Sequence, residues 1–175
     1  HKFLNERVRR DKKHIKLIGF KGNNDISKYL LKDIDCKFQS ELIGIKRHKD
    51  CWHLKFKDNS FVFSKNVIIT APFPQSKKLT SRFVKTKLFN NKVTMNASIT
   101  VLLMTNKTGN KFSSFFTNDA DLGWVSYENS KKRFKFDKDL WVLQSTFKYG
   151  KKHTDNYRNK KKYFTNYLIN KFTKL

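Results

Sequence analysis

The chain has 175 residues, of which 38% are hydrophobic, and it carries a formal net charge of +25. Its 17 Phe, 6 Tyr and 3 Trp exclude disorder throughout, and its two Cys are too few for a disulfide scaffold. No apolar run approaches the roughly 20 residues that a membrane helix needs. The length suits one domain, or one domain and part of another.

Lysine supplies most of the positive charge. The chain has 32 Lys and only 7 Arg, and the lysines run from Lys2 to Lys174. Specific nucleic-acid binding favours Arg, whose planar fork pairs with guanine and phosphate. We therefore interpret the charge as lysine on solvated surface, and we expect no specific nucleic-acid partner and no membrane partner. A basic nucleic-acid-binding α+β module stays open as the alternative, with salt-dependent binding to polyanions.

The first half of the chain predicts a helix followed by a β-meander. Asn23 or Asn24 can cap a helix whose apolar face carries Ile26, Tyr29 and Leu30. Alternating apolar residues between turn-forming residues then predict strands over 36–46, 52–56 and 61–63.

A short apolar run over 67–70 is typical of a strand buried on both faces. Pro72 and Pro74 follow it directly. Because proline cannot donate a hydrogen bond to a β-ladder, the chain is expected to leave the sheet there.

The second half begins with a lysine-rich helix or loop over 76–92. Further strands are expected over 97–104, 112–116, 122–127 and 140–146. Thr154 or Asp155 could cap a final helix. Its apolar stripe comprises Phe164, Leu168 and Phe172. The fold class predicted is α+β, with antiparallel strands and helices before and after them.

The sequence carries no signature of a familiar catalytic site. It has no G-x-S-x-G elbow, no H-E-x-x-H, no Walker loop and no G-x-G-x-x-G turn. Cys51 and His53 fall on the same side of a strand, but two further spaced ligands are missing. We therefore expect no metal site and a reduced pair of cysteines, and the catalytic residues stay unassigned.

Residues 67–75, with the sequence V-I-I-T-A-P-F-P-Q, resemble the V-V-L-A-I-P-A-P-Q motif of renalase-like FAD-dependent oxidoreductases, which belong to the monoamine-oxidase superfamily. Shorter segments resemble other motifs of that family in the same order. These segments are 18–30, 40–45, 122–131 and 140–146. Three residues depart from the family pattern: Asn23 stands in place of Met, Gln144 in place of His and Lys132 in place of Pro.

The resemblance implies that this chain is the central part of a longer flavoprotein. Residues 1–75 would be part of a Rossmann-type FAD-binding domain whose G-x-G-x-x-G turn lies outside the chain, and residues 76–175 would be part of a substrate domain built on an antiparallel sheet. The contacts implied for FAD are Leu42, Thr70, Ala71 and Pro72. The residues implied on the substrate side are Asn23, Asn24, Trp124 and Gln144.

The activity implied is that of a cytoplasmic FAD-dependent oxidoreductase. It would take a hydride from an amine or a dihydronicotinamide-type substrate and pass electrons to oxygen. FAD is the cofactor and a small molecule is the partner expected. The chain alone is expected to be inactive, because the phosphate-binding turn is not in its sequence. The oligomeric state stays open.

Overall fold

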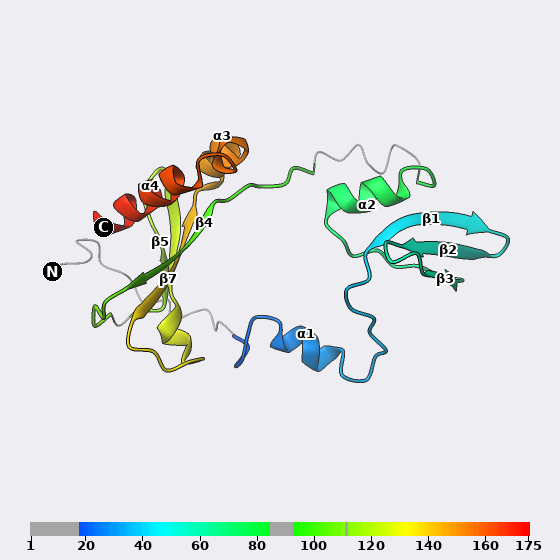
Figure 1. Cartoon of the computed structure of the whole chain (residues 1–175), viewed down its shortest axis with the longest axis horizontal. Helices are drawn as coiled ribbons and strands as arrows, with labels where there is room; N and C mark the ends of the chain where they lie inside the picture. The colour runs from blue at the N-terminus through cyan, green and yellow to red at the C-terminus, as the bar shows by residue number, and fades with distance from the viewer. Residues whose placement is uncertain (1–17, 85–92, 111) are drawn as a thin grey trace. The chain divides into compact units, whose positions relative to one another are not determined.

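The computed structural model describes residues 18–84, 93–110 and 112–175, and they form two units (Figure 1). We call Asp33–Thr94 the meander unit. The helix-backed unit comprises the described residues up to Lys32 together with Met95–Leu175. The chain thus leaves one unit and returns to it, whereas the sequence predicted one boundary between 75 and 76. The assignment of one unit to cofactor binding and the other to substrate binding stays a prediction.

The meander unit contains a three-stranded antiparallel sheet in the order β1-β2-β3. These strands are β1 (Leu42–His48), β2 (Cys51–Phe56) and β3 (Phe61–Ser64). The two expected turns are confirmed, with left-handed backbone at Lys49 (φ 50°) and Asn59 (φ 64°). The first strand begins at Leu42 and not at 36, because Gln39 also has a left-handed backbone (φ 57°) and interrupts the extended chain.

The prediction of a strand over 67–70 is wrong for this structure. These residues pair with no strand in the described part of the chain, and Ile68 is 90% exposed. A continuous apolar run forms a buried strand only where neighbouring strands flank it, and none flanks it here. The two prolines instead begin a helix. Pro72 is the N-cap of α2 (Phe73–Thr80), and Pro74 lies in its first turn, where a missing N–H costs nothing.

The helix-backed unit contains a four-stranded antiparallel sheet in the order β4-β7-β6-β5. Its strands are β4 (Thr100–Thr105), β5 (Ser114–Phe116), β6 (Leu122–Tyr127) and β7 (Asp139–Ser145). All four lie where strands were predicted, and β6 has the predicted bounds. A short α1 (Asp25–Leu30) precedes the sheet, a 3-10 turn η2 (Glu128–Lys131) follows β6, and α3 (Phe147–Tyr157) and α4 (Lys161–Thr173) end the chain. The α+β class is confirmed.

The core of this unit lies between one face of the sheet and the terminal helices (Figure 1). Val101, Leu143 and Val125 pair across three strands and are almost fully buried. The predicted stripe of α4 is confirmed, because Phe164, Leu168 and Phe172 belong to the same cluster. The pleat of the strands turns the alternate residues to the opposite face, which these helices do not cover.

The predicted caps of the final helix are wrong. Thr154 and Asp155 lie inside α3, and the N-cap of the final helix α4 is Lys160, which makes no side-chain capping hydrogen bond. The helix α3 is capped by Thr146, whose hydroxyl accepts a hydrogen bond from the Tyr149 N–H at 3.2 Å. The sequence suggested one helix where there are two, because the helical pattern of 161–173 continues that of 147–157 across a polar stretch. Gly150 lets α3 approach the preceding strand, since an added Cβ would lie 2.2 Å from the Ala97 carbonyl oxygen.

Candidate functional site

A pocket of about 580 Å³ opens in the helix-backed unit. It is formed by two segments that lie about ninety residues apart in the sequence, one around the start of α1 and one along β5, β6 and η2. Its lining residues are Ile18, Gly19, Asn23, Ile26, Ser113, Ser114, Trp124, Ser126, Ser130 and Lys131.

Arg133 joins the two segments. Its Nε donates to the Gly19 carbonyl oxygen at 3.0 Å, and a terminal guanidinium nitrogen donates to Asn23 Oδ1 at 2.7 Å. The turn that presents Asn23 requires glycine, because a Cβ on Gly19 would lie 1.9 Å from the Gly22 carbonyl oxygen. Asp25 closes this turn by accepting from the N–H of Lys21 and of Gly22. The Lys21 hydrogen bond also lowers the pKa of Asp25.

A polar triad forms one wall of this pocket. Glu128 Oε1 accepts from the Ser126 hydroxyl at 2.8 Å and from Lys131 Nζ at 2.5 Å. Ser126 is 1% exposed, and the side chains of Glu128 and Lys131 are 18% and 19% exposed, so the ion pair is half-buried. Asn129 holds η2 against β7 by donating to the Lys138 carbonyl and accepting from the Leu140 N–H. Glu128 thus holds the Lys131 side chain, and Asn129 holds the turn η2 that carries it.

The structure brings together two of the four residues predicted on the substrate side. Asn23 and Trp124 line the same pocket. Gln144 pairs with Trp124 across β6 and β7 and so lies on the same face of the sheet, but it does not line the pocket. Asn24 is the N-cap of α1, without a side-chain hydrogen bond to the helix, and it also lies outside the lining.

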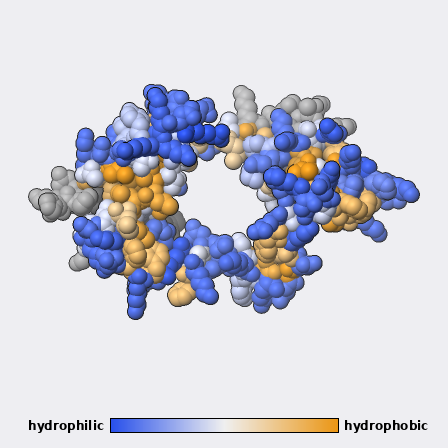
Figure 2. Space-filling view, in the orientation of Figure 1, coloured by the Kyte–Doolittle hydropathy of each residue, from blue (hydrophilic) through white to orange (hydrophobic). Residues whose placement is uncertain are grey.

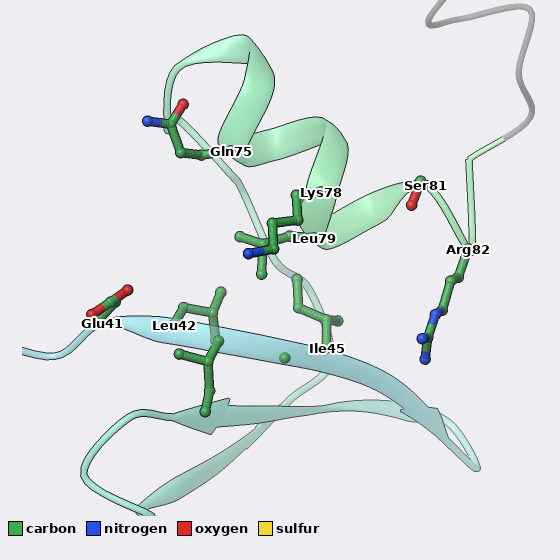
Figure 3. A pocket seen from close by; sticks show the side chains of 10 residues that line it. Glu41, Leu42, Ile45, Gln75, Lys78, Leu79, Ser81 and Arg82 are labelled. Atoms are coloured by element: carbon green, nitrogen blue, oxygen red, sulfur yellow. The ribbon is translucent and has the colours of Figure 1, made fainter.

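A second pocket, of about 500 Å³, lies in the meander unit between β1 and α2 (Figure 3). Leu42, predicted to contact FAD, lines it together with Leu79 and Ile45. Lys78 and Arg82 on its α2 side supply positive charge. Figure 3 shows Leu79 projecting from the helix toward the strand that carries Leu42 and Ile45.

The register of β1 changes between Leu42 and Gly44, so Ile43 has no partner in the ladder with β2. Ile43 also lines the second pocket. A bulge of this kind interrupts the regular exchange of hydrogen bonds between strands. The bulge therefore places Ile43, next to Leu42, outside the regular ladder and in the lining of this pocket.

Thr70, Ala71 and Pro72 do not line this pocket. They are exposed and lead into α2, where the Ala71 carbonyl accepts from the Ser76 hydroxyl at 2.7 Å and the Pro72 carbonyl accepts from the Ser76 N–H at 3.0 Å. Their carbonyl groups are thus used at the start of the helix. The role predicted for them in FAD binding stays a prediction.

Sequence reasoning missed Arg133 and Glu128. Arg133 is one of only 7 Arg in a chain with 32 Lys, and Glu128 is one of 14 acidic residues. Scarcity was the one signal that could have drawn attention to them. The contact of Arg133 with Asn23 spans 110 residues, so no spacing rule could reveal it. Glu128 and Ser126 lie two residues apart, but their contact depends on the turn that follows β6.

Comparison with known proteins shows that the fold of this chain is similar to part of a solved structure. No protein-family model matches the chain, and no curated protein matches it. Among solved structures, the chain is similar to the crystal structure of a "putative protoporphyrinogen oxidase" from Exiguobacterium sp. 255-15. The TM-score is 0.55 and the identity 15%, and the match covers 72% of this chain and 30% of that one. At this identity the likeness shows the fold alone.

The chain spans 30% of the length of that structure's chain. No helix in the described part of this chain is long and apolar enough to cross a membrane.

Proposed function

We propose that this chain is the central part of a renalase-like, FAD-dependent oxidoreductase. The observation that carries the proposal is the likeness of its fold to a structure named as an oxidase, with a TM-score of 0.55 over 72% of the chain. The resemblance of segments 18–30, 40–45, 67–75, 122–131 and 140–146 to motifs of that family, in the same order, supports the same class of protein.

The residues of the meander unit fit part of an FAD site. The bulge at Ile43 interrupts the ladder beside Leu42, and Lys78 and Arg82 provide positive charge that suits a phosphate-bearing cofactor. The glycine-rich turn that holds a pyrophosphate is not in this sequence. The proposal therefore assigns this unit to the adenine side of the cofactor, with Leu42 as its contact and with Thr70, Ala71 and Pro72 nearby.

When bound, the flavin ring would supply the chemistry, accepting a hydride from an amine or a dihydronicotinamide-type substrate and passing electrons to oxygen. The chain would contribute the substrate pocket, in which Trp124 offers a planar apolar surface and Asn23 a polar group. Gln144, beside Trp124, would extend the same face. We place this enzyme in the cytoplasm, with a small-molecule substrate.

The test is to express the longer polypeptide that contains this chain and to record its visible absorbance. We expect the yellow flavin spectrum, and FAD released on denaturation. The 175-residue chain is the matched control and should stay colourless, because it lacks the phosphate-binding turn. A folded longer polypeptide without flavin would refute the proposal.

A basic nucleic-acid-binding module is the second candidate, favoured by the net charge of +25. The densest group of exposed cations lies on α3, α4 and the residues between them. Its members are Lys148, Lys151, Lys152, Arg158, Lys160, Lys161 and Lys162.

Exposed lysines also occur on α1, β1 and α2, for example Lys28, Lys46 and Lys77, and hydrophilic residues cover much of the visible surface of both units (Figure 2). This spread counts against a dedicated nucleic-acid surface. Measuring polyanion affinity against salt separates the two candidates, because a dedicated site gives sequence or structure preference beyond the salt-dependent term.

A further inference from the structure

The pocket in the helix-backed unit offers several hydrogen-bond donors, of which the serine hydroxyls can also accept. The Ser113 and Ser114 hydroxyls make no hydrogen bond with the described residues of the chain. Lys131 has three N–H donors, and its hydrogen bond to Glu128 uses one of them. These three side chains line the same pocket.

Asn23 adds a further donor, because Arg133 determines how its amide is oriented. A guanidinium group only donates hydrogen bonds, so the Asn23 atom that faces it at 2.7 Å is the oxygen. The Asn23 NH₂ group is left without a partner among the described residues and remains available in the pocket. The two acceptors nearest to this wall are already used: Asn23 Oδ1 by Arg133, and Glu128 Oε1 by both Ser126 and Lys131.

The charges around the pocket agree with this arrangement. Lys131 is the one charged residue in the lining, Glu128 neutralises it through the ion pair, and Arg133 lies behind Asn23. Asp25, which closes the turn that presents Asn23, offsets the charge of Arg133, so the donors and not the net charge carry the preference for an oxyanion. An ammonium ligand would face hydrogen-bond donors and positive charge in this pocket. An oxyanion would instead accept hydrogen bonds from donors on α1, β5 and η2.

We propose that this pocket binds the carboxylate or phosphate group of a ligand whose planar part lies against Trp124. Lys131, Ser114 and Asn23 hold the oxyanion, and Glu128 keeps Lys131 in position. This inference rests on the proposed function. It narrows the substrate class of the proposed enzyme to planar anions and excludes simple amines as substrates. The same donors suit carboxylate and phosphate, which the experiment distinguishes.

The experiment is a titration of the isotope-labelled 175-residue chain, followed by NMR at the Trp124 indole N–H and the Ser114 amide. Phenyl phosphate, benzoate and benzylamine are the probes, at equal ionic strength. We expect at least one of the two anions to bind about tenfold more tightly than benzylamine, since one charge-assisted hydrogen bond accounts for such a ratio. The tighter anion identifies the oxyanion. Benzylamine binding equally well, or no anion-dependent change at these two signals, would overturn the proposal.

Variants separate this pocket from the general positive charge of the chain. Lys131→Met should weaken anion binding about tenfold, and Lys131→Arg should restore most of it. Lys148→Met removes the same charge from an exposed position on α3 and should leave the signals at Trp124 and their affinity unchanged. Equal losses in Lys131→Met and Lys148→Met would show non-specific binding and overturn the assignment.

Lys131→Met leaves Glu128 half-buried without its partner, so folding is checked by circular dichroism. If that variant unfolds, Ser114→Ala decides the question, because it removes a donor without disturbing the triad. Anion affinity unchanged in Ser114→Ala would then overturn the proposal. No flavin is needed in these measurements. A longer polypeptide without flavin would therefore refute the proposed function and not this site, and a flavoprotein without anion preference would refute only the site.

Discussion

Asp139 holds the end of β7 to the neighbouring loop, and its removal should destabilise the helix-backed unit. The residue is 1% exposed. Its carboxylate accepts from the Thr108 N–H at 2.7 Å, the Thr108 hydroxyl at 2.6 Å and the Tyr127 hydroxyl at 2.8 Å. Burial by itself would raise the pKa of Asp139, but these donors outweigh it and lower the pKa below 3.8. The folded state therefore contains a charged, fully hydrogen-bonded carboxylate.

Asp139→Ala removes the acceptor and leaves the partly buried Tyr127 hydroxyl without a partner, while the exposed Thr108 can bind water. We expect a loss of about 3 kcal/mol in the free energy of unfolding, from about 1–3 kcal/mol for the stranded Tyr127 hydroxyl together with the lost hydrogen bonds from Thr108 to the charged carboxylate. Asp139→Asn keeps one acceptor oxygen and should cost about half as much. The control is Asp137→Ala, two positions away and exposed, for which we expect a change within about 0.5 kcal/mol.

The assay is urea unfolding followed by far-ultraviolet circular dichroism, because the two longest helices, α3 and α4, both belong to the helix-backed unit. The pH dependence gives a second test. A lowered folded pKa contributes stability that is present above the unfolded value and lost as pH falls below it. The difference between the wild type and Asp139→Asn should thus be full at neutral pH and shrink below about pH 3.8. Equal stability of Asp139→Ala and Asp137→Ala would refute this reasoning.

Two further predictions concern α3. Gly150→Ala should destabilise the chain by about 1–3 kcal/mol despite the better helix propensity of Ala, because the new Cβ would overlap the Ala97 carbonyl; a gain in melting temperature would contradict this packing. Burial, reinforced by Tyr167 and Asp121, raises the pKa of Tyr149 to about 12. A raised folded pKa means that stability falls as pH rises from 10 toward about 12. The pKa values of Tyr127 and Tyr167 are raised as well, so Tyr149→Phe should remove one of several late-titrating groups from the tyrosinate absorbance.

The sequence predicted the strands well where local pattern and tertiary structure agree. β6 alternates between a core face and a pocket face, and its predicted bounds are those of the structure. The prediction of a strand over 67–70 is wrong because a continuous apolar run forms a buried strand only between two flanking strands. The described part of the chain places no such strands beside it. The predicted cap of the final helix is wrong because Thr154 and Asp155 lie within α3, a separate helix that follows β7 directly and was not predicted.

The candidate site was only half predictable, for a physical reason. Trp124 and Asn23 were named through a motif, but what makes their pocket specific is a set of long-range hydrogen bonds. The contact of Arg133 with Asn23 spans 110 residues. Side-chain orientation over such a distance depends on the folded backbone, and no local spacing rule contains it.

Two of the departures from the family pattern meet at this pocket. Lys132 stands where the family has Pro, and it adopts a left-handed backbone (φ 53°) that the proline ring forbids, because proline holds φ near about −65°. The residue after Lys131 could not have this conformation in the family's sequence. Asn23 stands where the family has Met, and a thioether is too weak an acceptor to replace the amide oxygen that binds Arg133. One departure changes the backbone beside Lys131 and the other creates the contact that frees the Asn23 amide. Both departures therefore lie at or next to donors that line the pocket, Asn23 and Lys131.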